Sequence, residues 1–105
     1  MNGAFELHPE AAQDITDISE YIAADSPQAA RRVSEDILEA IRSLVSVPHS
    51  GHTRPDTSRP LRFKIVRDYL IAYAPDETPL WVLAVMHGRR SLRTMAAILR
   101  GREPK

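Results

Sequence analysis

The chain of 105 residues contains no cysteine. This absence excludes a disulfide framework, a zinc site with thiolate ligands and a cysteine nucleophile. Only four glycines are present, and they are too scattered to form a phosphate-binding loop. No serine lies between the glycines of a strand-to-helix nucleophile elbow. Chemistry that depends on a nucleophilic side chain or a glycine-rich nucleotide site is therefore not expected.

Long apolar runs and an export signal are also missing. The run from Leu80 to Met86 has seven residues, whereas a membrane-spanning helix needs about 20. The first residues, Met1 to Glu6, contain no basic segment followed by an apolar one. With 43% hydrophobic and 27% charged residues, the composition is that of a globular domain. We therefore expect a single cytoplasmic domain over residues 1–105, with no membrane contact.

Neither sign of charge is in excess overall, because 14 basic and 14 acidic residues give a formal net charge of zero. The two halves of the chain nevertheless differ. Residues 1–53 carry nine acidic and three basic side chains, and residues 54–105 carry eleven basic and five acidic ones. The split is compatible with a basic surface for an acidic partner or a nucleic acid. It is equally compatible with two halves that neutralise each other across the fold.

Amphipathic helical patterns occupy the first half of the chain. The first pattern begins at Pro9, which suits the first turn of a helix, and ends near Ala24. Ser26 is placed to cap a second helix that Pro27 opens and that ends before Pro48. The predicted buried stripes are Ala11, Ile15, Ile18 and Ile22 in the first helix and Ala30, Val33, Ile37, Ala40, Ile41 and Leu44 in the second. Their short connection predicts an antiparallel helical hairpin.

Three strand-like runs, Leu61–Val66, Tyr69–Ala74 and Leu80–Met86, follow a loop from Pro48 to Pro60 and predict an antiparallel meander. In the first run, apolar Leu61, Phe63 and Ile65 alternate with Arg62 and Lys64, so one face is expected in the core and the other in water. The other two runs are nearly all apolar and are expected to be covered on both faces.

Further elements complete the prediction. Residues 4–7 can add a strand, Ser91 can cap a last amphipathic helix, and the tail 101–105 is expected to fray. The predicted fold class is α+β, with the order β-α-α-β-β-β-α and the helical hairpin packed on an antiparallel sheet.

Two candidate sites are weak. His49 and His52, with Asp56 nearby and His87 elsewhere, are the only possible metal ligands, and a flexible loop does not fix two imidazoles on one ion. No metal or other cofactor is therefore expected. The carboxylates Asp14, Asp17 and Glu20 are better explained as the solvated face of a helix than as acid–base catalysts.

Basic side chains form a stronger candidate for a binding site. In a meander we expect the start of the first strand and the end of the third to lie together, so that Arg62 converges with Arg89 and Arg90. Converging guanidinium groups suit phosphates or carboxylates. The alternative is a sheet edge kept charged against aggregation. The candidate residues are Arg62, Lys64, His87, Arg89, Arg90 and Arg93.

Several strings, in order along most of the chain, resemble the ParE branch of the ParE/RelE superfamily of bacterial toxins. They are Phe5-Glu-Leu-His-Pro-Glu-Ala-Ala, Asp14-Ile-Thr-Asp-Ile-Ser-Glu-Tyr-Ile, Pro27-Gln-Ala-Ala, Val47-Pro-His-Ser-Gly, Leu61-Arg-Phe, Tyr69-Leu-Ile-Ala-Tyr and Val85-Met-His-Gly-Arg. Where that branch often has glycine in the hairpin, this chain has Arg67-Asp68. The resemblance implies a single ParE/RelE-like domain.

The resemblance also implies a type II toxin held inactive in a hetero-oligomer by a co-encoded, ParD-like antitoxin. ParE-branch toxins are associated with inhibition of DNA gyrase, whereas the RelE branch cleaves messenger RNA on the ribosome with several lysines and arginines and a C-terminal tyrosine. Here Lys64 is the only lysine before Lys105, and no tyrosine follows Tyr73. A gyrase-binding toxin without catalytic residues is therefore the leading prediction. A RelE-like ribonuclease and a non-toxic interaction module that retains the fold are the alternatives.

Overall fold

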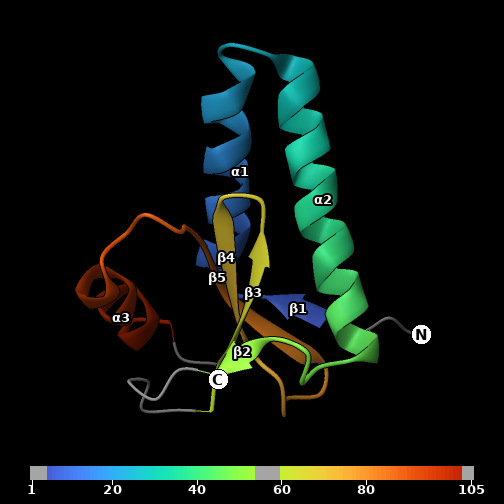
Figure 1. Ribbon diagram of the computed structural model, residues 1–105, viewed down its shortest axis with the longest axis vertical. Helices are drawn as coiled ribbons and strands as arrows, with labels where there is room; N and C mark the ends of the chain where they lie inside the picture. The colour runs from blue at the N-terminus through green and yellow to red at the C-terminus, as the bar shows by residue number, and fades with distance from the viewer. Residues whose placement is uncertain (1–4, 54–59, 103–105) are drawn as a thin grey trace.

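The computed structural model describes residues 5–53 and 60–102. A helical hairpin stands against one face of a twisted sheet, and a third helix lies on the other side of the sheet (Figure 1). In chain order the elements are β1 (Phe5–Leu7), α1 (Pro9–Ala23), α2 (Pro27–Ser46), β2 (His52–Thr53), β3 (Arg62–Val66), β4 (Tyr69–Ala74), β5 (Leu80–His87) and α3 (Leu92–Arg100). The order confirms the predicted α+β fold and adds the short strand β2 to the segment predicted as a loop.

Local capping groups set the beginnings of the two long helices. The Ser26 hydroxyl accepts a hydrogen bond from the Ala29 N–H at 3.1 Å, and Pro27 is the first residue of α2. At the start of α1, His8 Nδ1 accepts from the Glu10 N–H at 3.0 Å, a cap that the sequence pattern did not reveal. These contacts satisfy N–H groups that have no partner inside the helix. The predicted helix boundaries are confirmed.

The five strands form one sheet in the order β1-β5-β4-β3-β2. β3, β4 and β5 form the predicted antiparallel meander, and β2 pairs antiparallel with β3. β1 pairs with β5 in the parallel direction, with Phe5 opposite Leu80. The sheet is therefore mixed and not purely antiparallel. The part of the chain between β1 and β5, which includes α1 and α2, is long enough for β5 to return beside β1 in the parallel direction.

Apolar side chains fill both faces of the sheet. Toward the hairpin the largest fully buried side chains are Ile37, Ile41, Leu44, Ile71, Tyr73 and Val82. Toward α3 the buried cluster includes Phe63, Trp81, Leu83, Met86, Met95 and Leu99. Every residue of β5 from Leu80 to Met86 is buried, and β4 is buried from Ile71 onward. The prediction that these two strands are covered on both faces is confirmed.

β3 departs from the prediction at Ile65. Phe63 is 3% exposed, as expected of a core residue, whereas Ile65 on the same face of the strand is 59% exposed. The cause is the position of α3, which packs against β5, two strands away, and leaves Ile65 in solvent. The prediction that Ile65 lies in the core is wrong. On the opposite face, Arg62 and Lys64 are half-buried and not fully in water as predicted.

The β3–β4 turn forms at Arg67-Asp68 despite the absence of glycine. Arg67 has a φ angle of 55°, in the left-handed region that most residues avoid. Its guanidinium group contacts Asp36 of α2, with Nε and Nη2 each 2.7 Å from Oδ2. The ion pair therefore fastens the turn to α2 and offsets part of the backbone strain.

Asp14 and Arg102 close an open edge of β5. β1 pairs with β5 only as far as Val82, so the next part of that edge has no neighbouring strand among the described residues. There the Val85 N–H donates to Asp14 Oδ2 at 3.0 Å, and Arg102 Nη1 donates to the Leu83 carbonyl at 3.2 Å. The two side chains also contact each other at two pairs of atoms. Together they take the place of a paired strand.

This contact corrects two predictions. Asp14 does not belong to a solvated helix face, because its side chain is 19% exposed and bound to Arg102 and β5. The beginning of the tail does not fray, because Arg102 is 9% exposed. Residues 103–105 lie outside the described part of the chain. A carboxylate and a guanidinium 88 residues apart thus fix the end of α3 to α1 and β5.

Candidate target-binding surface

The six basic residues predicted to bind a target do not form one patch. Arg62 lies opposite Tyr73 at one end of β4, and His87 lies opposite Tyr69 at the other. Tyr69 and Tyr73 are four positions apart on β4, about 13 Å along the strand. The expected convergence of Arg62 with Arg89-Arg90 is wrong. The first and third strands of a meander run in the same direction, so the start of the first strand and the end of the third lie at opposite ends of the sheet.

Arg62 instead holds the loop that follows α2. Its Nη1 donates to the Gly51 carbonyl at 2.8 Å. The Tyr73 hydroxyl accepts from the Gly51 N–H at 3.0 Å and donates to the Pro48 carbonyl at 2.7 Å. Gly51 is required by this close approach, since a Cβ atom there would lie 2.5 Å from the Tyr73 oxygen. Two side chains of the sheet therefore fix the path of the Pro48–Gly51 segment.

The Tyr73 hydroxyl titrates in an unusual environment. Burial raises the pKa of Tyr73 above its ordinary value, because the phenolate would lose its hydration. The hydrogen bond from Gly51 and the positive charge of Arg62 oppose this effect and are smaller. Sequence reasoning placed Tyr73 on a buried strand but missed its polar contacts, which join residues 22 and 25 positions apart. We assign this cluster to the fold and not to a binding site.

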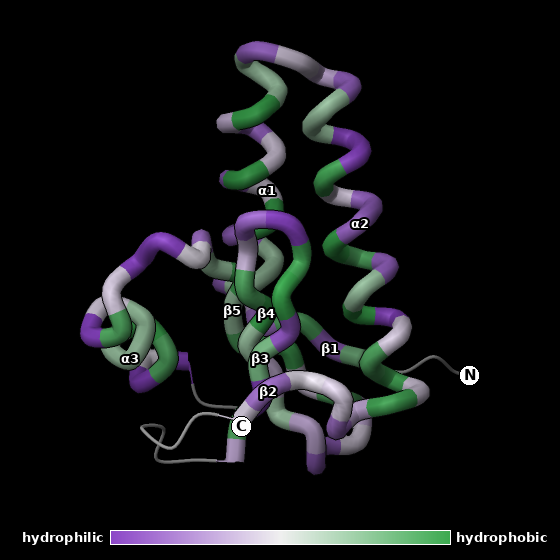
Figure 2. Tube along the Cα trace, in the orientation of Figure 1, coloured by the Kyte–Doolittle hydropathy of each residue, from purple (hydrophilic) through white to green (hydrophobic). Residues whose placement is uncertain are grey.

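The other predicted residues, apart from Lys64 in the middle of β3, gather where β5 passes into α3. We call His87, Arg89, Arg90 and Arg93 the β5–α3 basic surface. The chain turns sharply there: the Gly88 N–H donates to the Asp68 carbonyl at 2.7 Å, and the Arg90 N–H donates to the His87 carbonyl at 3.1 Å. The connection from β5 to α3 is the hydrophilic segment on the left of Figure 2.

The arginines of this surface are open to solvent. Arg89, Arg90 and Arg93 are exposed, and among residues 5–53 and 60–102 none of them forms an ion pair with an acidic side chain. Arg67 and Arg102, by contrast, are each held by an aspartate. The three free guanidinium groups therefore keep their hydrogen-bonding capacity for a partner.

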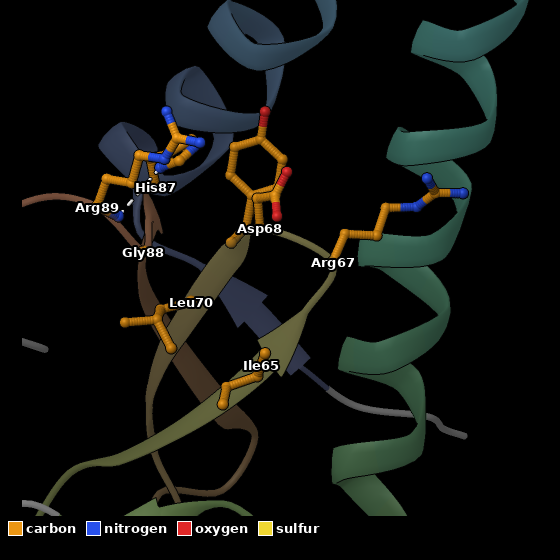
Figure 3. A pocket seen from close by; sticks show the side chains of 8 residues that line it. Ile65, Arg67, Asp68, Leu70, His87, Gly88 and Arg89 are labelled. Atoms are coloured by element: carbon orange, nitrogen blue, oxygen red, sulfur yellow. Dashed lines mark hydrogen bonds between the residues drawn. The ribbon is translucent and has the colours of Figure 1, made fainter.

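A cavity of about 280 Å³ opens beside the basic surface, at the tip of the β3–β4 hairpin. Figure 3 shows His87 and Arg89 on one side and Ile65 and Leu70 on the other. The His87 ring meets the Tyr69 ring edge to face, with centroids 5.4 Å apart, and His87 Nδ1 accepts from the Arg89 N–H at 3.0 Å. The remaining residues that line the cavity are Arg67, Asp68 and Gly88. The cavity was not predicted from the sequence. The pairing of Tyr69 with His87 follows only from the register of β4 and β5.

The candidate metal ligands are dispersed. His49 Nε2 lies 3.2 Å from Asp76 Oδ1 at an exposed position, His52 is exposed on β2, and His87 lies near the other end of the sheet. Asp56 lies outside the described residues. Within the part of the chain that the structure describes, no three histidine or acidic side chains gather as a metal site would require. The same part contains no helix that is both long and apolar enough to cross a bilayer.

A helical hairpin on a mixed five-stranded sheet, with a third helix on the far side, defines an α+β protein of the RelE/ParE-like fold. A family model described as the ParE toxin of the type II toxin–antitoxin system parDE matches residues 5–92. The chain therefore belongs to the ParE toxin family and is the toxin of a toxin–antitoxin pair. A search of curated proteins finds no match.

Proposed function

We propose that this toxin acts by binding DNA gyrase, and that a co-encoded ParD-like antitoxin neutralises it in the cytoplasm. The observation that carries the proposal is the β5–α3 basic surface, whose three arginines are exposed and have no acidic partner among the described residues. Planar guanidinium groups bind carboxylates and phosphates through paired hydrogen bonds. Gyrase bound to its DNA offers both kinds of group.

Inhibition by binding requires no proton transfer from the toxin. Cleavage of RNA, in contrast, needs groups that activate the 2′-hydroxyl, stabilise the phosphorane and protonate the leaving oxygen. One lysine before Lys105 and no tyrosine after Tyr73 are a poor supply of such groups. At the basic surface, one nitrogen of His87 is already occupied by the Arg89 N–H. These features support gyrase binding over ribonuclease activity.

One observation favours the ribonuclease alternative. The cavity beside the basic surface is lined by an imidazole, a carboxylate, a phenol and arginines from neighbouring positions, His87, Asp68, Tyr69, Arg67 and Arg89. Groups of these kinds can accept and donate protons around a phosphate. His87 is the residue on which this alternative depends, because imidazole is the usual proton carrier near neutral pH.

Apolar side chains left in solvent support an antitoxin of amphipathic character. Tyr21 on α1 is 82% exposed, Ile65 on β3 59%, and Val47 and Leu92 54% each. An amphipathic segment can cover such positions with apolar anchors at helical spacing. The isolated toxin is expected to be poorly soluble or to self-associate, and to form a stable hetero-oligomer with the antitoxin. Size-exclusion chromatography tests this, and a monodisperse monomer that ignores the product of the adjacent gene would contradict it.

The experiment that separates the two mechanisms compares the wild type with His87→Gln. Glutamine keeps a hydrogen-bonding group of similar size but cannot act as an acid or base near neutral pH. If the toxin binds gyrase, His87→Gln retains most of its inhibition of supercoiling by purified gyrase. If it is a nuclease, the same substitution lowers cleavage of messenger RNA on programmed ribosomes by about 10²-fold or more.

Each outcome assigns a mechanism. Codon-dependent cleavage by the wild type that His87→Gln loses, with supercoiling untouched, would falsify the gyrase proposal and promote the ribonuclease. A wild-type chain that neither inhibits supercoiling nor cleaves messenger RNA would identify a non-toxic interaction module that retains the fold.

A further inference from the structure

We propose that α3 and the turn before it form a binding surface for the phosphate backbone of duplex DNA, so that the toxin contacts DNA directly. The surface is made of four arginines, Arg89, Arg90, Arg93 and Arg100. The inference rests on the proposed function, because it uses three arginines of the β5–α3 basic surface. It adds Arg100 to them and names duplex DNA as the ligand. The family match ends at Leu92, so Arg93 and Arg100 lie outside the matched residues.

The geometry of α3 places the cations in a row. Arg93 and Arg100 are seven residues apart, close to two full turns, so they lie on the same side of the helix about 10 Å apart. The opposite side carries Met95 and Leu99, which are buried against the sheet. Arg89 and Arg90 lie in the turn directly before the helix and add two cations near its beginning. Duplex DNA carries one phosphate per 3.4 Å of each strand, so guanidinium groups with this spacing meet different phosphates.

The charge of the four arginines is not neutralised within the described residues. All four are exposed, and none forms an ion pair with an acidic side chain there. From Gly88 to Arg102 the sequence contains no aspartate or glutamate. Arg102, the fifth arginine of this stretch, is bound to Asp14 and fixes the end of α3 in place. The helix that carries Arg93 and Arg100 is thus held at its end by Arg102, and the four arginines stay without an acidic partner among the described residues.

The character of the surface favours a duplex over the other polyanions. Single strands are held by stacking of bases on aromatic side chains, and residues 88–100, which form α3 and the turn before it, contain no aromatic residue. Protein interfaces centre on large apolar or aromatic anchors, and Leu92 is the only large apolar side chain exposed on α3. The other exposed groups are hydroxyls and small side chains, Ser91, Thr94 and Ala97. A sequence-independent contact with phosphates fits this composition.

The rest of the molecule orients the contact. The exposed carboxylates Asp17 and Glu20 lie in the second half of α1, whose far end stands away from α3 in Figure 1, whereas Glu10 at the start of α1 has its Oε1 3.7 Å from Arg102 Nε. Since like charges repel and opposite charges attract over about a Debye length, a polyanion approaches the α3 end and avoids the hairpin. Ion pairs such as Arg67–Asp36 and Arg102–Asp14 neutralise part of the charge of the two halves across the fold, whereas the four arginines at the α3 end stay exposed.

The test measures binding of the full-length toxin to a fluorescent 20-base-pair duplex over a series of salt concentrations. Four phosphate contacts predict a slope of about −3.6 in a plot of log K against log salt, since each contact contributes about −0.9. Arg93→Gln with Arg100→Gln should make the slope less steep by about 1.8 and weaken binding at 0.1 M salt roughly 10- to 100-fold. The matched control is Arg31→Gln with Arg32→Gln, an exposed pair at the start of α2, which should change neither quantity.

Other ligands and a parallel assay decide the remaining cases. No duplex binding by the wild type at 50 mM salt, an equal slope in both double variants, or stronger binding of single-stranded RNA or polyglutamate than of the duplex would overturn the inference. Supercoiling by gyrase is measured with the same proteins. Gyrase inhibition without duplex binding would overturn the DNA contact and leave the proposed function intact. Duplex binding without inhibition would support the DNA contact and overturn the proposed function.

Discussion

Tyr73→Phe removes a single oxygen atom and two hydrogen bonds from the loop after α2. The hydroxyl accepts from the Gly51 N–H at 3.0 Å and donates to the Pro48 carbonyl at 2.7 Å. A net contribution of about 1 kcal/mol per hydrogen bond, and a buried N–H left without a partner at Gly51, predict a loss of about 2 kcal/mol. For a domain near 100 residues this loss lowers the melting temperature by about 10 °C.

Thermal unfolding followed by circular dichroism at neutral pH measures the effect. The matched control is Tyr21→Phe, because Tyr21 is 82% exposed, and its unfolding free energy should change by less than about 0.5 kcal/mol. Equal stability losses in the two variants would refute the assignment of Tyr73 as the anchor of the loop.

The raised pKa of Tyr73 adds a dependence on pH. The folded state holds this proton more tightly than the unfolded chain, whose tyrosines titrate near 10. The stability from Tyr73 is therefore fully present below about pH 10 and is lost as the pH rises through the folded-state pKa. Above pH 10 the wild type should lose unfolding free energy faster than Tyr73→Phe. Parallel curves for the two proteins would contradict the pKa shift.

Three further substitutions test the fold and the surface. Asp14→Ala leaves Arg102 with only the longer contact to Glu10 and leaves the β5 edge open, and it should cost about 3 kcal/mol in denaturant unfolding, whereas Glu39→Ala, which breaks an exposed ion pair, should cost less than about 1 kcal/mol. Gly51→Ala should cost about 1–3 kcal/mol in the same assay, because its Cβ atom overlaps the Tyr73 hydroxyl. Reversal of the Arg89-Arg90 pair to glutamate should abolish toxicity in cells and preserve antitoxin binding in a pull-down, because we assign antitoxin binding mainly to apolar surface. A loss of both would place the antitoxin on the arginines.

Local chemistry made most of the elements predictable. Ser26 and Pro27 act on the residues next to them, so the beginning of α2 follows from the sequence without knowledge of the rest of the fold. The apolar runs of β4 and β5 are long enough to require burial on both faces. The exposure of Ile65 could not be predicted, because it depends on which strands α3 covers, and the pattern of β3 does not contain that information.

The contacts that escaped prediction join distant parts of the chain. Asp14 follows the pattern of a solvated helix face, and only the position of Arg102 and of the open β5 edge shows that it is bound. Arg62 was separated from the candidate surface by strand direction, since a basic residue at the start of β3 and one at the end of β5 lie at opposite ends of the sheet. The residues of the β5–α3 basic surface are adjacent in sequence, so the sequence alone predicts that they lie together, and their role in binding stays a prediction.

Supercoiling of relaxed plasmid by purified gyrase, with increasing amounts of full-length toxin, tests the proposed function most directly. The proposal predicts inhibition by the wild type, equal inhibition by Arg31→Glu with Arg32→Glu on α2, and its loss in Arg89→Glu with Arg90→Glu at the β5–α3 basic surface. Both double variants change the net charge by the same amount, so a general effect of charge would affect them alike. Supercoiling that the wild-type toxin leaves untouched, or that both variants inhibit as well as the wild type, would contradict the proposal.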